Sequence, residues 1–364
     1  MDKIKMIILL AVPTTICNLK CRYCYLSQRE SSFSGEQAQM EYSPMEVAKA
    51  LSKERIGGTA FINICADGET LLTKNIDEYI YLLAKEGHYI EIVTNLTVTP
   101  VIDKILTWEK DILEHITFKC SFHYLQLKER NWLDRFSMNV NKIWQAGASA
   151  NIEITPDDEL IPYIDEVKEF SIANFGALPQ LTIARDDNDK HNYLTNLTID
   201  EYDKIWSQFN SNFWQFKKAI FNVDRKEFCY AGQWSVYINL ATGMANQCYL
   251  TNERVNVFEN IDEPIRLRPI CKCIDTHCYN GHALLTLGLI PGLTTIGYGD
   301  IRDREREDGT HWIRPQMKEF LNSKLEESNS KYSKSEKRRL IINNYIKYPK
   351  HYIGKELRKL HILK

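Results

Sequence analysis

The sequence lacks any apolar run long enough to cross a membrane, and it has neither internal repeats nor low-complexity segments that hint at function. A bilayer span needs about 20 apolar residues. The apolar stretch within MDKIKMIILLAVPTTIC is far shorter and has no small-residue cleavage site, so a buried first strand explains it better than a secretory signal peptide. Neither a membrane protein nor an exported one is indicated, and we expect a cytoplasmic location.

The composition is that of an ordinary soluble protein, with 44% hydrophobic and 26% charged residues in a chain of 364. That length suits one large domain with a smaller one. Ten cysteines without an export signal indicate a reducing compartment, where thiols hold metal instead of forming disulfides.

The small net charge of −2 conceals a basic end. Residues 331–364 carry 11 Lys and Arg against two Glu, interleaved with Leu, Ile and Tyr, so we expect helices there. A solvated basic cap on an acidic body is the simpler interpretation. The alternative is a surface for an anionic partner, such as a phosphorylated substrate, a membrane surface or nucleic acid.

The most informative feature is the run CNLKCRYCY, which holds Cys17, Cys21 and Cys24. A cluster built for electron transfer usually takes four cysteines, so three thiolates at this spacing indicate an iron–sulfur cluster with one iron left open. Zinc sites pair two closely spaced ligands with two more downstream, and disulfides need an exported chain, so both alternatives fit poorly.

With an aromatic residue on each side of Cys24, the motif resembles that of the radical S-adenosylmethionine (SAM) superfamily. The resemblance implies a [4Fe–4S] cluster on the three cysteines, with the amine and carboxylate of SAM on the open iron. It also implies reductive cleavage of SAM to a 5′-deoxyadenosyl radical that takes a hydrogen atom from the substrate, in a site that the protein shields. Tyr23 belongs to the motif and is a candidate cofactor contact.

Strand-like and helix-like segments alternate six times between residues 4 and 209, which predicts parallel strands joined by right-handed helical crossovers. The expected strands are 4–12, 60–65, 89–96, 115–124, 150–155 and 178–185. The expected helices are 43–56, 75–87, a segment from 99, part of 133–147, 161–176 and 198–209. Six units instead of eight leave a partial (β/α)6 barrel, the α/β fold that the resemblance implies, with ligands at the carboxyl ends of the strands.

Polar residues at these strand ends are candidate SAM contacts. Asp67, Gly68 and Glu69 resemble the family's Gly-Gly-Glu, with Asp in place of the first Gly. Gly68 permits the turn, and Glu69 suits an ammonium group. The other candidates are Thr94, Asn95, Ser121, Glu153 and Arg185, with His123 as a candidate substrate contact. As alternatives, the Thr-Asn pair can simply form a turn, the Glu-Arg pair can be structural, and the histidine can be a satisfied strand-end residue.

Five further cysteines lie downstream, at Cys229, Cys248, Cys271, Cys273 and Cys278. The first two, with Gly243 and a hairpin expected over 234–243, resemble the opening of the SPASM/twitch extension, which implies an auxiliary [4Fe–4S] cluster. Five thiols are too few for two clusters, so one is expected, on Cys229, Cys248 and two of the last three. The spare thiol, for which Cys278 is a candidate, either returns a hydrogen atom to a substrate radical or is passive. Structural zinc is the alternative for the set.

The expected domains are the partial barrel (1–222), a twitch-like cluster domain (223–300) and a charged helical extension (301–364). The resemblance implies an oxidoreductase or epimerase that takes hydrogen from an unactivated C–H bond. It also implies that a flavodoxin- or ferredoxin-type donor supplies electrons to the enzyme. A polar metabolite of sugar or aminocyclitol type is the expected substrate, because only 16 residues precede the first motif cysteine and peptide-modifying relatives often carry a leader-binding domain there. A ribosomal peptide or protein is the alternative. A nucleic-acid-binding or RNA-modifying protein that uses the basic end is the alternative of another class.

Overall fold

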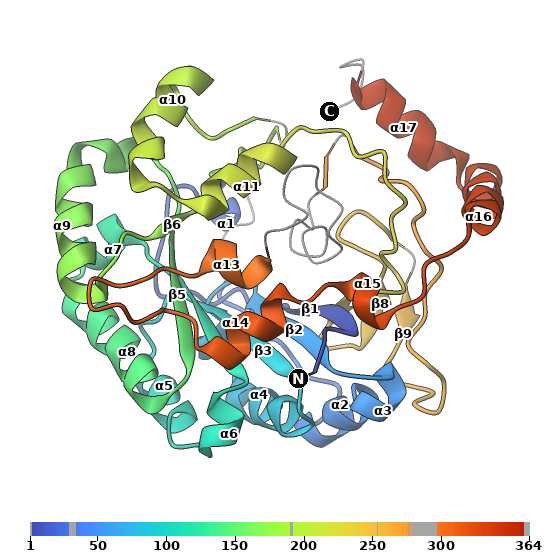
Figure 1. Ribbon diagram of the computed structural model, residues 1–364, viewed down its shortest axis with the longest axis horizontal. Coiled ribbons are helices and arrows are strands. Elements are labelled where there is room, and N and C mark those ends of the chain that lie inside the picture. The colour runs from blue at the N-terminus through green and yellow to red at the C-terminus, as the bar shows by residue number, and fades with distance from the viewer. Residues whose placement is uncertain are drawn as a thin grey trace.

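The computed structural model describes residues 2–28, 34–189, 192–252, 254–275, 277–278 and 297–359. At its centre is a nine-stranded sheet of order β6-β5-β4-β3-β2-β1-β7-β8-β9 (Figure 1). Its strands are β1 (Met6–Val12), β2 (Ala60–Ala66), β3 (Tyr89–Thr94), β4 (Ile116–Ser121), β5 (Ser149–Ile154), β6 (Gln180–Leu181), β7 (Ser235–Asn239), β8 (Met244–Asn246) and β9 (Val255–Asn256).

Strands β1 to β6 pair in parallel and in chain order, because a helical crossover returns the chain after each of them. The crossover helices lie along the outer side of the curved sheet (Figure 1). They are α2 (Pro44–Ala50), α3 (Lys53–Ile56), α4 (Ile76–Lys85), α5 (Thr99–Ile105), α6 (Lys110–Leu113), α7 (Tyr124–Glu129), α8 (Leu133–Ala146) and α9 (Ile164–Phe175), with α10 (Ile199–Trp206) after β6. The partial barrel predicted from the sequence is confirmed.

Alternation along each strand separates an outer face from an inner one. In β4, Phe118 and Cys120 pack in the core beneath the outer helices. Thr117, Lys119 and Ser121 therefore face the barrel interior.

The amino ends of the strands are closed from inside by an apolar floor. There, α11 (Asn212–Ile220), α13 (Tyr298–Arg302) and α14 (Pro315–Asn322) pack against the strands, and Figure 1 shows the last two in orange across the sheet. This cluster includes Ile7, Phe61, Tyr89, Phe213, Phe216, Tyr298, Met317 and Phe320. Because one end of the barrel is filled, only the carboxyl ends of the strands are left to form a site.

The helix predicted over 43–56 is divided in two. A capping box of Ser43 and Glu46 begins α2, but Ser52 takes extended geometry and accepts the Arg55 N–H as the cap of α3. A residue that caps a new helix cannot also continue the preceding one. The helix is therefore interrupted at Ser52, although the apolar periodicity of the sequence continues across this position.

Two strands also differ from the simple pattern. The sixth strand is reduced to Gln180–Leu181, because its partner β5 ends at Ile154, shortly before Pro156. In the expected hairpin, β7 and β8 pair in antiparallel fashion, and β7 also pairs in parallel with β1. The strands beyond the sixth unit therefore extend the barrel sheet itself.

The basic end of the chain forms α16 (Lys334–Lys347) and α17 (Pro349–Lys359), after the short α15 (Leu325–Ser328). Across the described ranges, no helix combines the length and apolar character needed to cross a membrane. The three domain boundaries stay predictions, and residues 279–296 and 360–364 lie outside the described residues.

Candidate active site

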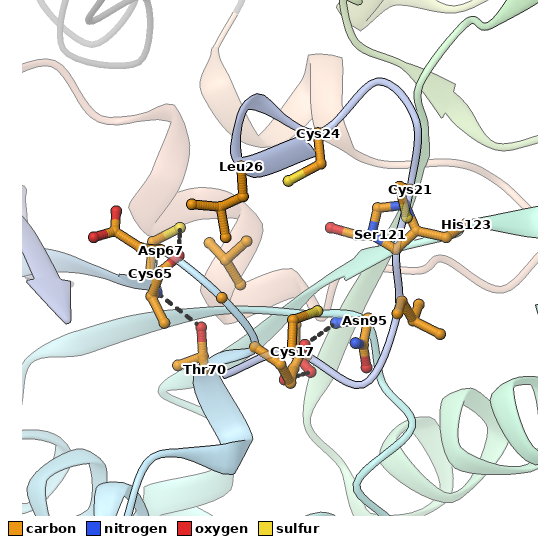
Figure 2. Close-up of a pocket in the computed structure, with 16 residues that line it drawn as sticks. Cys17, Cys21, Cys24, Leu26, Cys65, Asp67, Thr70, Asn95, Ser121 and His123 are labelled. Carbon is orange, nitrogen blue, oxygen red and sulfur yellow. Dashed lines mark hydrogen bonds between the residues drawn. The ribbon is translucent and has the colours of Figure 1, made fainter. Parts of the chain in front are cut away.

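Cys17, Cys21 and Cys24 lie on the segment between the carboxyl end of β1 and the short helix α1 (Tyr25–Gln28). This segment curves over the carboxyl ends of the neighbouring strands. Figure 2 shows Cys21 and Cys24 on its upper part and Cys17 lower, between Thr70 and Asn95. One continuous stretch therefore presents three thiols at the sheet edge where parallel α/β proteins bind ligands.

The turn after β2 holds the start of this segment by direct backbone contact. The Gly68 N–H donates to the Thr14 carbonyl at 2.7 Å, and the Glu69 N–H donates to the Ile16 carbonyl at 2.8 Å. A Cβ added to Gly68 would lie 2.2 Å from the Ile16 carbonyl oxygen. Glycine is required here because two backbones touch, so any side chain would push the cysteine segment away.

Glu69 is buried, with 3% of its surface exposed, and its carboxylate is held by three donors. Oε1 accepts the Thr94 hydroxyl at 2.6 Å and the Leu71 N–H at 3.0 Å, and Oε2 accepts the Asn95 N–H at 2.7 Å. Burial raises the pKa of Glu69, and these donors oppose the shift. Because Oε2 has a single donor, it keeps a lone pair for a ligand.

A second set of side-chain bonds joins this strand end to the cysteine segment. Asn95 Nδ2 donates to Asn18 Oδ1 at 2.8 Å, and Asn18 Nδ2 donates to the Thr97 hydroxyl at 2.7 Å. The Thr97 hydroxyl closes the ring by donating to Asn95 Oδ1 at 2.7 Å. Asn95 therefore orients the residue next to Cys17.

The far side of the cysteine segment is tied to the ends of β4 and β5. Arg22 forms an ion pair with buried Asp157 and a second with Glu159 at 3.2 Å. The Tyr23 hydroxyl bonds His123 Nδ1 at 2.7 Å. Burial lowers the pKa of His123 to about 4, so the imidazole is neutral near pH 7. Tyr23 thus belongs to the support of the site, behind the pocket.

Most of the predicted site residues share one pocket. Its lining includes Cys17, Cys21, Cys24, Asp67, Gly68, Glu69, Thr94, Asn95, Ser121 and His123, together with Leu19, Leu26, Cys65, Ala66, Thr70 and Val93. Cys65 lines the pocket beside Asp67 (Figure 2).

Glu153 and Arg185 are not among the residues that line this pocket. Glu153 instead forms ion pairs with Arg302 and, at 3.4 Å, with Lys119 inside the barrel. Arg185 offers its backbone carbonyl to Gln28 Nε2 at 3.2 Å, beside the end of α1. A cofactor role for either residue stays a prediction.

The downstream cysteines divide by exposure. Cys271 is completely buried, and its sulfur accepts the Asn344 amide at 3.1 Å and contacts the Pro269 carbonyl at 3.3 Å. The other four, Cys229, Cys248, Cys273 and Cys278, are half-buried. Burial raises the pKa of the Cys248 thiol, and Cys273 and Cys278 add to that shift.

The basic helices α16 and α17 hold this cysteine segment. Asn344 of α16, 5% exposed, donates to the carbonyls of Pro269 and Ile270, both at 3.1 Å. Lys355 of α17 donates to the Cys273 carbonyl at 3.1 Å and pairs with Asp224. Two polar residues of the basic end therefore serve as structural contacts.

The spacing of the motif cysteines bears on which metal group they could hold. Among the described residues, no three Cys, His, Asp or Glu side chains are close enough to hold one metal ion. The ligands of a cluster are spread over several irons, so wider spacing is expected of them. Burial raises the pKa of the Cys17 thiol to about 11, and a bound metal would supply the positive charge that stabilises a thiolate. With Gly68 leaving room for the segment and Glu69 facing the pocket, these residues fit a [4Fe–4S] cluster with SAM.

Residues 11–116 match the family model of the Radical SAM superfamily. The resemblance found in the cysteine motif is therefore confirmed over these residues. Comparison with curated proteins gives no match.

Several solved structures are similar to this chain. Streptococcus suis SuiB bound to S-adenosylmethionine is 14% identical with a TM-score of 0.49, over 72% of this chain and 65% of SuiB. The anSMEcpe structure with bound AdoMet is 14% identical with a TM-score of 0.47, over 70% of this chain and 78% of that one. BtrN in complex with AdoMet and 2-DOIA is 16% identical with a TM-score of 0.35, over 72% of this chain and 76% of BtrN. This chain thus spans slightly less than two thirds of the length of SuiB.

Sequence reasoning did not identify several residues that shape the site. Asn18 sits within the CNLK run itself, and its amide could have been recognised as a polar group beside the first cysteine. Arg302 and Asn344 carry no local signal, because their partners lie more than 70 residues away along the chain.

Proposed function

We propose that this protein is a radical SAM enzyme in which Cys17, Cys21 and Cys24 hold a [4Fe–4S] cluster and the strand-end pocket holds SAM. The supporting observation is that three thiols from one loop share a pocket with the buried carboxylate of Glu69. When bound, the cluster and SAM supply a 5′-deoxyadenosyl radical, which takes a hydrogen atom from a substrate C–H bond.

The protein's own residues bind and orient. Oε2 of Glu69 keeps a lone pair for the ammonium group of SAM, and the Thr94 and Asn95 donors hold that carboxylate in place. Asp67 is held at the pocket edge by the Tyr25 hydroxyl, which donates to its carbonyl at 2.7 Å. Ser121 and His123 extend the polar lining toward the substrate.

For the auxiliary cluster we infer the ligands Cys229, Cys248, Cys273 and Cys278. These four thiols are half-buried, whereas the Cys271 sulfur is enclosed by Asn344 and Pro269. With a cluster at this place, the electron released on oxidation of the substrate has an acceptor inside the protein. This favours oxidation over epimerisation, in which Cys278 would instead be a free thiol that donates hydrogen.

The substrate that suits the site best is a polar metabolite of sugar type, taken into the barrel below the cofactor pocket. The polar inner face of β4 and β5 supports this choice, because Lys119, Asn151 and Glu153 lie there. A ribosomal peptide is the alternative. A cytoplasmic location and a flavodoxin- or ferredoxin-type electron donor complete the proposal.

Anaerobic reconstitution followed by iron counting and a SAM-cleavage assay tests the function. Wild-type protein should hold about eight irons per chain and release 5′-deoxyadenosine. Cys17→Ala should lose about four irons and all SAM cleavage. Cys120→Ala is the matched control, because this thiol is fully buried on the helix side of β4. Folded wild-type protein that takes up no iron, or that holds iron and never cleaves SAM, contradicts the proposal.

A further inference from the structure

Below the cofactor pocket, the barrel interior contains a cluster of charged and amide side chains. We call it the inner polar layer and define it by its members Asn63, Glu91, Lys119, Asn151, Glu153, Lys217 and Arg302. The strand residues among them lie on inward-facing positions of β2 to β5, and register pairs Lys119 with Asn151. The layer rests on the apolar floor that α11, α13 and α14 build.

Both carboxylates of this layer are already in use. Glu91, 1% exposed, accepts from Asn63 Nδ2, from the Tyr298 hydroxyl at 3.2 Å and from Arg302 at 3.5 Å. Glu153 pairs with Arg302 and, at 3.4 Å, with Lys119. The ion pairs of these two carboxylates are therefore formed with Arg302 and Lys119, and neither carboxylate forms one with a third cation of the layer.

Lys217 on α11 is that third cation. Among the residues that the structure describes, none forms a hydrogen bond or ion pair with its amine. Its Nζ lies 4.8 Å from the centre of the Phe213 ring, and the Arg302 guanidinium lies 4.5 Å from the same ring. Burial, with the positive charges of Lys119 and Arg185, lowers the pKa of Lys217 to about 7. The nearby Glu91 and Cys278 oppose that shift. Glu91 is already bonded to Asn63, Tyr298 and Arg302, and no carboxylate among the described residues forms an ion pair with Lys217, so this buried amine is suited to an anion.

A neutral donor in the same layer also lacks an acceptor. Asn151 is 1% exposed, and its Nδ2 has no hydrogen-bond partner among the described residues. Leaving a buried donor unpaired destabilises the folded protein. A ligand oxygen placed between β5 and the two lysines, Lys119 and Lys217, would accept a hydrogen bond from this amide.

The layer is open toward the cofactor pocket. Lys119 precedes Ser121 by two residues on the same face of β4, and Ser121 lines that pocket. The Lys119 side chain is 16% exposed, whereas that of Arg302 is 1% exposed, so the lysine faces open space and the arginine is sealed. A ligand held at Lys119 would therefore have its remaining atoms below the cofactor pocket.

We propose that Lys217 and Lys119, with the Asn151 amide, bind an oxyanion of the substrate, either a carboxylate or a phosphate group. The inference rests on the proposed function for what happens to that substrate, but the anion site itself does not need the cluster. The anion site favours an acidic sugar-type metabolite over an aminocyclitol. The inner polar layer has one cation more than it has carboxylates, so it would repel an ammonium group.

Titration of the reconstituted full-length protein with inorganic phosphate, and separately with acetate, tests the site by calorimetry. One of the two anions should bind wild-type protein, and the stronger one identifies the group. Lys217→Met should weaken that binding by about tenfold or more, since a hydrogen bond to a charged group is lost. Asn151→Asp should weaken it as well, by like-charge repulsion. Lys218→Met is the matched control on the same helix, because that amine is paired with Asp203 at 2.5 Å.

A second measurement needs no variant. Acylation of wild-type lysines, followed by mass spectrometry, should show Lys217 protected by the bound anion and Lys218 not protected. Absence of anion binding in the wild type, equal losses in Lys217→Met and Lys218→Met, or no protection of Lys217 each overturns the inference. Iron content and SAM cleavage are read in parallel. An iron-free protein that still protects Lys217 refutes the proposed function alone, and a SAM-cleaving protein without anion binding refutes the anion site alone.

Discussion

The Thr94 hydroxyl donates a hydrogen bond of 2.6 Å to Oε1 of Glu69, which joins the end of β3 to the turn after β2. The same carboxylate caps the short 3-10 helix Thr70–Leu72 through the Leu71 N–H and accepts the Asn95 N–H. Glu69 is therefore a structural centre of the strand ends as well as a candidate SAM contact, and both roles depend on a charged acceptor at one position.

Glu69→Gln should lower both stability and SAM affinity. An amide offers one acceptor oxygen in place of two, so at least one of three buried donors loses its partner, at about 1–3 kcal/mol. Urea denaturation measures the first effect and equilibrium binding of SAM to the reconstituted protein measures the second. Glu54→Gln is the control, because this side chain is exposed on α3. Unchanged SAM affinity in Glu69→Gln would exclude the proposed contact.

Gly68→Ala should displace the cysteine segment and reduce the iron bound after reconstitution. The added Cβ would lie 2.2 Å from the Ile16 carbonyl oxygen, and backbone on both sides leaves it no room to move. Overpacking of this kind costs about 1–3 kcal/mol.

Gly147→Ala is the comparison for that variant. Gly147 has a φ of 96° and nothing within 4 Å of an added Cβ, so alanine there strains the backbone without a clash. It should lose about 1 kcal/mol of stability and keep its iron. Equal iron loss in both variants would mean that general destabilisation, and not the contact with Ile16, explains the result.

The sequence was informative wherever function depends on local spacing. Cys17, Cys21 and Cys24 are close in sequence, and parallel strands necessarily bring Glu69, Thr94 and Ser121 to one edge. Alternation along β4 likewise separates Lys119 from Cys120 without knowledge of the fold.

Long-range partners were beyond that reasoning. Glu153 pairs with Lys119 and with Arg302, and the arginine lies on a helix that returns to the barrel from the far end of the chain. A pairing of Glu153 with Arg185 therefore had equal support from the sequence. The break at Ser52 was also missed, because Ser52 caps the second helix while the apolar pattern continues across it. Pairing of β7 with β1 depends on the whole sheet, and no local pattern encodes it.

His88 should make stability depend on pH in mildly acidic solution. It is fully buried between α2 and β2, where Nδ1 accepts the Ala60 N–H at 3.0 Å and Nε2 donates to the Leu51 carbonyl at 2.7 Å. Burial lowers its pKa from 6.5 to about 4, and Lys53 and His115 nearby add to that shift.

Between those two pH values the unfolded chain binds a proton at His88 and the folded chain does not, so stability falls as pH drops from about 6.5 to 4. The full contribution is about 3 kcal/mol. His123 and His115 shift in the same direction, so the wild-type slope contains several histidines. Denaturation of wild type and His88→Gln across this pH range isolates the contribution of His88 to the pH dependence of the unfolding free energy. An identical dependence in the two proteins would refute that contribution.

Cys271 and Cys273 should respond differently to replacement, although one residue separates them. The Cys271 sulfur is sealed between the Asn344 amide and the Pro269 carbonyl, so Cys271→Ala should keep all the cluster iron and lose only packing. Cys273 is half-buried, and its carbonyl is fixed by Lys355. Its thiol donates to the His277 carbonyl at 3.6 Å, a long contact that a bound metal would replace. Cys273→Ala should therefore lose about four irons while the SAM-cleaving cluster stays.

Iron counting measures the total cluster content of each variant. Release of 5′-deoxyadenosine in the absence of substrate, measured in the same sample, shows whether the SAM-cleaving cluster is intact. If Cys271→Ala loses iron and Cys273→Ala keeps it, the ligand assignment is reversed, and Cys273 becomes the thiol available for hydrogen donation.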